Sequence, residues 1–559
     1  MSQTKTERIT KRQLGQFMTP PVLAARLVQD MAWTPDDAVL EPSFGNGSFI
    51  LPLIEAFLPF YEGSIDKRLA SVLTRNVYGI EYDSALYSEC LQAIQKRWGE
   101  LPARHNLVCG DFFRHWFYDE QFMPANIPAN QVREGSGGLF DVYQHFDVIV
   151  GNPPFGGTID PALQDQLDKQ FGLRGGEKIK KETYSFFIVK CLDLLKPQGR
   201  LRFICSDTFL TINTMRGLRL FVMGQGKPSI MSLRGFSDET KYPMVVLDIM
   251  KSPSEFLSVN GADIAYSTIH KTGNASWQVT DDLAGYFDGP KIGDYLVATS
   301  GMTTGANELF VRPIVNGRIK EPYTFEFYED PITLRREQER ARLGIISPRK
   351  QQEILQAEQE GRTRRNVRVA ARAEPVEIIL PHPDYRFYNK AAKGLVYAPP
   401  SHVIYWKDDG DAVLTFKKNG NWYLHGVGGM PYFGRSGLTW PLIATSLNAR
   451  FLSEGSILDS GAPCAFLRPG VGEDELYFIL AWTFSPLCQR LLKEVVNHTK
   501  NIQGKDVERL PYPFWVEATH KTDIICRVRT LVADAMQGRI VTKADTDFRA
   551  VAESFTSKI

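Results

Sequence analysis

The first half of the sequence predicts an α/β fold with a doubly wound, mostly parallel sheet, and three observations support this prediction. Short apolar runs rich in β-branched residues recur along it, and each ends at a carboxylate, a glycine or a proline. Segments with helical spacing separate these runs, as the crossover connections of parallel strands require. In the second half this alternation of strands and helices stops, and short strand-like runs occur among aromatic residues, glycines and prolines. This change predicts a C-terminal domain of mixed α+β structure.

The composition excludes several classes of protein. The 559 residues are 43% hydrophobic and 23% charged, which is typical of a globular chain with two to four domains. No apolar run reaches about 18 residues and residues 1–12 are polar and basic, so we expect no membrane association. Seven cysteines without a C-x-x-C pair favour a reducing cytoplasm and no metal site. With a net charge of only +1, a nucleic-acid partner would require positive charge gathered on one face.

The first expected helix follows the segment 15–20, which reads GQFMTP. Thr19 stands before a proline and is a favourable N-cap, so the helix is expected over residues 22–31. Phe17 supplies an aromatic ring just before that start.

A strand, a glycine loop and a helix are expected over residues 39–49. Glu41 and Pro42 end the strand, and Gly45 and Gly47 allow the backbone to approach a ligand and turn into the helix. Such a loop also cradles dinucleotides and phosphates, but the full G-x-G-x-x-G pattern is absent because position 50 is isoleucine. Glu41 would attract a cationic amine and repel a pyrophosphate. The loop therefore favours a sulfonium amino acid over NAD.

Two further strands, over residues 77–83 and 106–112, also end in carboxylates. Glu81 at the end of the second strand is placed to bridge two ribose hydroxyls. Asp111 could accept a hydrogen bond from an adenine amine while Phe112 packs on the ring. A single strand-end carboxylate is often only a helix cap, whereas three in series indicate a shared ligand site.

A rigid turn follows the next strand, which is expected over residues 146–150. The turn consists of Asn152, Pro153, Pro154 and Phe155. Two prolines remove two backbone donors, so the Asn152 amide and the Pro153 carbonyl offer two acceptors beside an aromatic face. That combination suits a planar base with an exocyclic amine.

These motifs and their order resemble those of the γ-class N6-adenine DNA methyltransferases of the Asn-Pro-Pro-Phe type. The resemblance implies a Rossmann-like methyltransferase sheet with S-adenosylmethionine as cofactor. It implies that the GQFMTP segment lies over the methionine end of the cofactor and that the Asn-Pro-Pro-Phe turn is catalytic. It also implies a second aromatic residue that stacks on the extruded base, for which Phe236 is the candidate and Tyr242 the reserve.

The remaining elements of the first half complete the sheet. We expect an irregular insertion over 113–145 and a loop over 156–182 whose cations touch the DNA backbone. A helix over 183–196 and strands over 201–205, 231–236 and 244–250 follow.

Three domains are expected. Residues 1–255 form the catalytic domain, 256–514 a target-recognition region with a basic helical segment over 331–374, and 515–559 a C-terminal helical segment. Strand-like runs in the second domain include 403–407 and 413–416. This half resembles the target-recognition regions of type IIG and BREX-associated adenine methyltransferases.

The predicted function is therefore site-specific methylation of adenine in double-stranded DNA by base flipping, in a prokaryotic cytoplasm and associated with the nucleoid. A separate restriction endonuclease or subunits of a phage-defence system are candidate partners. An N4-cytosine methyltransferase and a non-catalytic specificity subunit are the alternatives. Enzymes that methylate ribosomal guanine or protein glutamine carry similar turns but are usually more compact.

Overall fold

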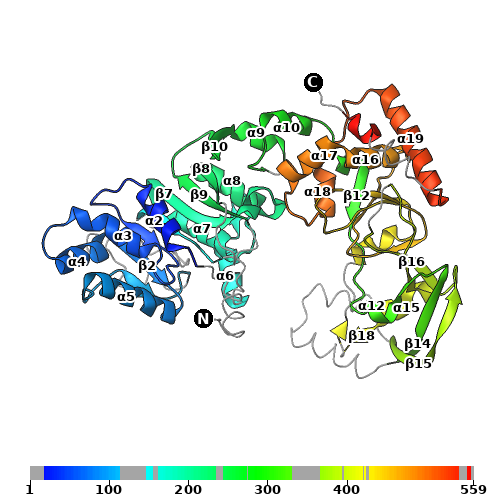
Figure 1. Cartoon of the computed structure of the whole chain (residues 1–559), viewed down its shortest axis with the longest axis horizontal. Helices are drawn as coiled ribbons and strands as arrows, with labels where there is room; N and C mark the ends of the chain where they lie inside the picture. Colours follow the sequence, from blue (N-terminus) through cyan, green and yellow to red (C-terminus); the bar gives the residue numbers. More distant parts are fainter. Residues whose placement is uncertain are drawn as a thin grey trace. The chain divides into compact units, whose positions relative to one another are not determined.

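The computed structural model describes residues 18–113, 146–154, 161–233, 243–273, 275–329, 365–392, 396–418, 421–422, 427–539 and 550–555. The chain divides into two compact units, Met1–Gly285 and Tyr286–Ile559, which we call unit 1 and unit 2 (Figure 1).

Unit 1 is built on a nine-stranded sheet with the order β11-β10-β8-β9-β7-β4-β1-β2-β3. The run from β7 to β3 is parallel, whereas β9 is antiparallel to both β7 and β8. Chain order reverses between β1 and β4, which is where doubly wound sheets bind ligands. The strands are β1 (Val39–Glu41), β2 (Val77–Glu81), β3 (Leu107–Cys109), β4 (Phe146–Gly151), β7 (Leu195–Ser206), β8 (Lys227–Leu233), β9 (Met244–Met250), β10 (Phe256–Val259) and β11 (Ala262–Ala265).

Helices pack on the sheet through apolar faces. On α4 the buried residues Leu69, Val72 and Leu73 recur at helical spacing, so one face of this helix meets the core. The helix α5 begins at Asp83, whose side chain accepts from the backbone of Ala85 and caps the first turn. The helices of unit 1 are α2 (Pro21–Gln29), α3 (Ile50–Phe57), α4 (Ile65–Arg75), α5 (Ser84–Trp98), α6 (Pro161–Phe171), α7 (Thr183–Leu194), α8 (Arg216–Gln225), α9 (Tyr266–Lys271) and α10 (Asp281–Ala284).

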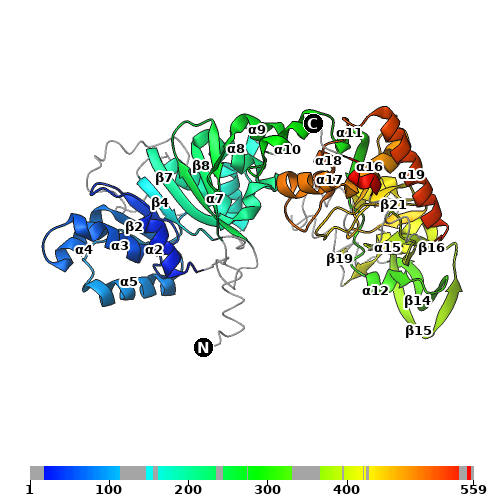
Figure 2. The same ribbon diagram turned by 45° about the horizontal axis from the view of Figure 1, so that its top comes forward.

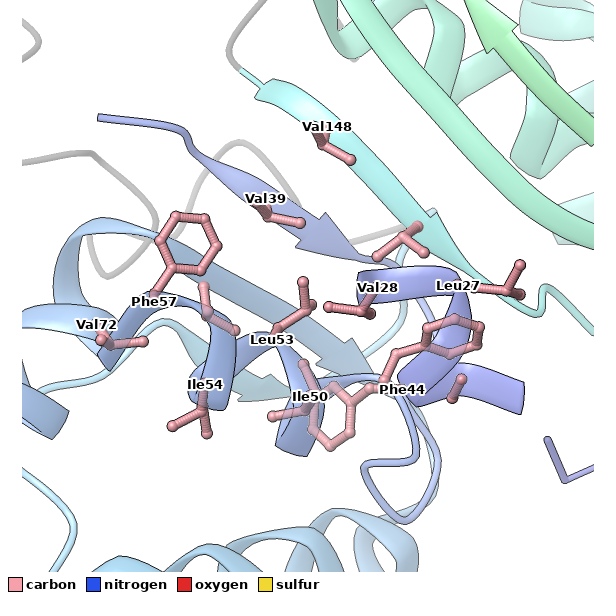
Figure 3. Packing of buried hydrophobic residues seen from close by; sticks show 14 of the residues in the cluster. Leu27, Val28, Val39, Phe44, Ile50, Leu53, Ile54, Phe57, Val72 and Val148 are labelled. Atoms are coloured by element: carbon pink, nitrogen blue, oxygen red, sulfur yellow. The ribbon is translucent and has the colours of Figure 1, made fainter. Parts of the chain in front are cut away.

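One core joins α2, α3 and α4 to the strands beside the switch point. Leu53 and Phe57 of α3 lie under the strands, with Phe57 near Val72 of α4 and Leu53 near Val28 of α2 (Figure 3). Val39 and Val148 contribute from the two central strands. This core fixes the loop between β1 and α3 against the carboxyl ends of the strands.

The α/β prediction is confirmed for unit 1, with two differences. The expected loop over 156–182 is wrong for the described part of it, because α6 is followed by the hairpin of β5 (Leu173–Arg174) and β6 (Glu177–Lys178). The sheet also continues past residue 255, since β10 pairs with β8 and β11 with β10. The compact unit ends at Gly285.

Unit 2 has a mixed α+β structure. Two four-stranded sheets, with the orders β12-β23-β20-β21 and β13-β17-β16-β22, are accompanied by the long hairpin β14–β15 (Figure 2). Its strands are β12 (Leu296–Thr299), β13 (Val311–Pro313), β14 (Arg318–Glu329), β15 (Arg365–Ile379), β16 (Tyr385–Asn389), β17 (His402–Tyr405), β18 (Lys417–Lys418), β19 (Asn421–Trp422), β20 (Gly437–Thr439), β21 (Arg450–Leu452), β22 (Ser456–Leu458) and β23 (Cys464–Leu467). Its helices include α11 (Ile292–Tyr295), α12 (Asn307–Phe310), α15 (Asp411–Thr415), α16 (Asp474–Phe484), α17 (Pro486–Arg490), α18 (Gly504–Arg509) and α19 (Ala518–Met536).

Two expectations for unit 2 are wrong. Residues 413–416 were expected in a strand, but Asp411–Thr415 is the helix α15. The basic segment 331–374 was expected to be helical, but from Arg365 onward it is the strand β15, paired antiparallel with β14. Residues 331–364 lie outside the described residues. In the described parts of both units, no helix combines the length and the apolar character needed to cross a bilayer.

Candidate active site

The carboxyl ends of neighbouring parallel strands bring four of the predicted residues of unit 1 to one edge of the sheet. Strand β1 pairs with β4 on one side and with β2 on the other, and β2 pairs with β3. Glu41 and Glu81 are the last residues of their strands, Asp111 follows the end of β3, and Asn152 follows β4 directly. Side chains that are distant in sequence therefore share one edge at the switch point.

The loop between β1 and α3 requires glycine at two positions. Gly45 has a φ of 56° and Gly47 a φ of 92°, both in the left-handed region. A Cβ on Gly47 would lie 2.5 Å from Cys90 Sγ, so this position has no space for a side chain. Pro42 is buried at the start of the loop, as expected of a residue that fixes its direction.

Glu81 holds the glycine loop in place. Its Oε2 accepts from the Gly45 backbone N–H at 2.7 Å, and its Oε1 accepts from the Asp83 N–H at 2.8 Å. Burial raises the pKa of the Glu81 carboxyl, and these backbone donors oppose that rise. Each carboxylate oxygen can accept more than one hydrogen bond, so capacity for ligand hydroxyls is left.

Glu41 is a buried acid for which the described residues supply no counter-charge. It is 2% exposed, and its Oε2 has no hydrogen-bond partner among the described residues. Burial and, to a lesser degree, the charge of Glu81 raise the pKa of Glu41 well above the usual range. A Cβ on Gly151 would lie 2.9 Å from Glu41 Oε1, so the glycine at the end of β4 leaves room for this carboxylate. A cation bound here would relieve the cost of burying the charge.

Asn152 and Thr19 meet across 133 residues of sequence. The Asn152 Nδ2 donates to Thr19 Oγ1 at 3.2 Å, which leaves Oδ1 as the acceptor atom of this amide. Ser48 of the glycine loop donates from Oγ to the Thr19 carbonyl at 3.0 Å. The expected helix cap is wrong, because Pro20 occupies the N-cap position of α2. The Thr19 hydroxyl joins the start of α2 to the turn after β4 instead.

Phe112 packs against the helix α7 beside the same edge. It is 3% exposed and stacks on Phe187 with ring centroids 4.8 Å apart. The Asp111 carboxylate accepts from the Phe113 N–H at 2.8 Å, so it also orders the chain after β3.

Lys190 is a site-adjacent residue that the sequence reasoning missed. Its Nζ donates to the Phe112 carbonyl and lies 4.3 Å from the centroid of the Phe112 ring. Burial lowers its pKa to about 7. A lysine inside the apolar helix run 186–192 was the available signal, because a buried cation needs a partner.

The two prolines of the turn are among the described residues, whereas three other predicted site residues are not. Pro153 is buried and Pro154 is half-buried directly after Asn152. Phe17, Phe155 and Phe236, together with the reserve Tyr242, lie outside the described residues.

The strand order and the glycine loop together define an open α/β domain, a class in which ligands bind at the switch point of the sheet. Comparison with known proteins agrees with this class. The family described as Eco57I restriction-modification methylase matches residues 62–233, which is less than half of the chain.

Among curated proteins, the type II methyltransferase M.BstVI of Geobacillus stearothermophilus is 26% identical over 225 residues, which are 38% of this chain and 36% of that protein. The type II methyltransferase M.XhoI of Xanthomonas vasicola is 26% identical over 205 residues, 35% of this chain and 33% of that protein. The matched part thus spans about a third of each relative's length.

A solved structure shares the fold of nearly the whole chain. It is a nuclease-deletion mutant of the type ISP restriction-modification enzyme LlaGI in complex with a DNA substrate mimic. The similarity covers 93% of this chain and 54% of that one, with a TM-score of 0.54 and 12% identity. At this identity the similarity shows the fold alone.

Proposed function

We propose that this chain is a site-specific DNA methyltransferase that uses S-adenosylmethionine to methylate the N6 amine of adenine in duplex DNA. The observation that carries the proposal is the meeting of Asn152 with Thr19 beside the buried Glu41, whose Oε2 has no partner among the described residues. An amide acceptor for an amine thus lies at the same sheet edge as an acid that attracts a cation. The match over residues 62–233 and the two related methyltransferases support the same chemistry.

The described residues fit S-adenosylmethionine in charge. Its amino acid half carries a cationic amine, for which the partnerless Oε2 of Glu41 is a suitable acceptor. Glu81 would hold the ribose hydroxyls, and Asp111 and Phe112 the adenine. When bound, this cofactor supplies an electrophilic methyl group on a sulfonium sulfur. The other members of the proposed cofactor site are Phe17, Thr19, Pro42, Gly45 and Gly47.

The turn after β4 would hold the substrate amine. Its lone pair is delocalised into the base, so the enzyme must make it available without removing a proton completely. Hydrogen bonds from the amine to Asn152 Oδ1 and to the Pro153 carbonyl favour a pyramidal nitrogen, and fixed alignment supplies much of the rate. The rigid Pro153–Pro154 backbone keeps these acceptors in place. Phe155 and Phe236 would replace the stacking that the base loses on extrusion from the duplex.

Unit 2 is proposed to recognise the DNA target. The support is that the fold similarity to LlaGI, which was solved with a DNA substrate mimic, extends over both units. The proposed setting is a restriction-modification or phage-defence system, with a separate endonuclease or defence subunits as partners. N4-cytosine methylation remains the alternative because its amine has the same geometry.

Methyl transfer to genomic DNA tests the proposal. The purified chain is incubated with the cofactor and DNA, and the nucleosides are analysed by mass spectrometry. We expect N6-methyladenine with the wild type, at least about 100-fold less with Asn152→Ala, and normal yield with Asn213→Ala, an exposed asparagine of unit 1. Cofactor binding by Asn152→Ala, measured by calorimetry, shows that the variant is folded. Detection of N4-methylcytosine instead would mean that the acceptor is cytosine. Absence of methylated nucleosides from every sample would contradict the proposal.

A further inference from the structure

The helix α7 holds the segment that follows β3 through two side chains on one face. Phe187 and Lys190 are three residues apart, which places them side by side on the helix surface. Phe187 stacks on Phe112 with ring centroids 4.8 Å apart, and it meets the ring of Phe113 edge-on at 4.8 Å. Lys190 Nζ donates to the Phe112 carbonyl and lies 4.3 Å from the centroid of the Phe112 ring. One lysine therefore contacts both the backbone and the ring of Phe112.

The burial of Lys190 is costly for the fold. The residue is 2% exposed, on a helix most of whose residues are buried. A buried lysine loses the solvation of its amine and the rotamer freedom of its long side chain. A methionine would fill similar space without the loss of solvation. The contacts of the amine, rather than packing alone, therefore explain a lysine at this position.

These contacts converge on the proposed adenine site. Phe112 directly follows Asp111, which is the proposed acceptor for the amine of the cofactor's adenine. Burial lowers the pKa of Lys190 to about 7, whereas the charge of Asp111 acts in the opposite direction, so the amine lies within electrostatic range of this carboxylate. The protonated and the neutral amine both carry N–H groups, so donation to the Phe112 carbonyl does not require the charge.

We propose that Lys190 is a positioning residue that fixes the Phe112 carbonyl and thereby directs the Asp111 carboxylate at the adenine amine of S-adenosylmethionine. This inference rests on the proposed function, because Asp111 belongs to the cofactor site proposed there. The strength of a hydrogen bond depends steeply on distance and angle. Release of the Phe112 carbonyl would let the segment after β3 move and weaken the bond to the amine. The contacts proposed for Glu41 and Glu81 with the rest of the cofactor would remain.

Replacement of adenine by hypoxanthine isolates this bond. Hypoxanthine has an oxygen where adenine has the N6 amine, so it presents an acceptor, not a donor, to Asp111. Calorimetry measures the affinity of the full-length chain for S-adenosylhomocysteine and for S-inosylhomocysteine. We expect the wild type to prefer the adenosyl compound by about 10- to 150-fold, as for a hydrogen bond to a charged group.

The variant Lys190→Met tests the positioning role. We expect it to bind the adenosyl compound about tenfold more weakly and the inosyl compound within about twofold of the wild type, because only the first bonds to Asp111 through an amine. A merely structural role would weaken both compounds equally, and that result would overturn the inference. An undiminished preference for the adenosyl compound would overturn it as well.

Lys251→Met is the matched control on the same helix. Lys251 Nζ donates to the carbonyls of Leu192 and Leu195, at 2.8 and 2.7 Å. This variant also removes a lysine that donates to backbone carbonyls, but these bonds hold the C-terminal end of α7 and not the segment after β3. We expect the affinities for both compounds to equal those of the wild type.

A second variant keeps the inference testable if Lys190→Met does not fold. In Lys190→Gln an amide donor replaces the amine on a side chain that is one bond shorter, so the bond to the Phe112 carbonyl is stretched. We expect its preference for the adenosyl compound to lie between those of the wild type and Lys190→Met. If Lys190→Met does not fold, a wild-type preference in Lys190→Gln would overturn the inference.

Methyl transfer separates this inference from the proposed function. Lys190→Met should raise KM for S-adenosylmethionine about tenfold and leave kcat within about twofold, because the contacts of Lys190 are with the adenine segment. A wild type that methylates DNA, with Lys190 variants that keep its adenosyl preference, would refute the inference and leave the proposed function intact. Loss of the preference in a chain without methyl transfer to DNA would support the inference and contradict the proposed acceptor. A wild type that binds neither compound would overturn both.

Discussion

Replacement of Glu41 by glutamine exchanges a buried carboxylate for an amide of the same size at the end of β1. The folded protein raises the pKa of this carboxyl well above its ordinary value of 4.5, first through burial and then through Glu81. The contribution of such a group to the free energy of unfolding is fully present below its pKa in the unfolded chain and is lost as the pH rises through its pKa in the folded protein. Glutamine does not titrate, so the variant does not lose this contribution. We therefore expect the cofactor-free variant to be more stable than the wild type at neutral pH, with the difference vanishing towards pH 4.5.

The size of both effects follows from the contacts of Glu41. Its Oε2 has no partner among the described residues, and a buried unsatisfied polar group costs about 1–3 kcal/mol. The glutamine amide would leave a similar unsatisfied group, so the gain without cofactor comes from removal of the buried charge and should be on the order of 1 kcal/mol at neutral pH. The variant should also lose a charge-assisted hydrogen bond to the cofactor amine, worth about 1.5–3 kcal/mol, which corresponds to roughly 10- to 150-fold weaker binding.

Two assays measure these opposite changes. Urea denaturation at several pH values gives the free energy of unfolding, and calorimetry gives the affinity for S-adenosylmethionine. Glu89→Gln, at an exposed glutamate of α5, is the matched control and should alter neither. Unchanged cofactor affinity in Glu41→Gln, or a cofactor-free variant less stable than the wild type, would refute this account of Glu41.

Three further substitutions probe the same edge of the sheet. Gly47→Ala should lower the free energy of unfolding by about 1–3 kcal/mol in urea denaturation, since φ is 92° and the new Cβ would meet Cys90; a smaller effect would show that the loop can adjust. Burial lowers the pKa of Lys190 to about 7, so the contribution of this residue to the free energy of unfolding rises between pH 7 and pH 10.5. Lys190→Met should therefore flatten the free energy of unfolding over this pH range. An unchanged pH dependence would contradict burial of this lysine. Thr19→Val should lower kcat about 2- to 13-fold by releasing Asn152 while leaving the melting temperature nearly unchanged, and full activity would exclude this role.

The fold of unit 1 was predictable because the sequence features that indicate its strands are local. Each parallel strand is a short apolar run, and the residues that end it are polar or conformationally special. The helix α6 was missed although Leu163, Leu167 and Phe171 recur every four residues, because the glycine pair after it suggested a loop. In unit 2, the apolar run 413–416 favoured a strand on composition alone. The helix there begins after Gly410, whose φ of 85° turns the chain.

The placement of the described candidate residues at one edge of the sheet was predictable, but their contacts were not. Strand ends and chain order are enough to bring Glu41, Glu81 and Asn152 to one edge of a parallel sheet. No local pattern shows that Glu81 accepts from the Gly45 backbone or that Asn152 donates to Thr19, because both bonds depend on tertiary packing.

Single-molecule sequencing of DNA from cells that express the chain tests the central claim most directly. Cells expressing Asn152→Ala serve as the control. The account predicts N6-methyladenine at one repeated sequence motif with the wild type and none at that motif with the variant. The same methylated motif with Asn152→Ala, or no modified motif with either chain, would contradict it.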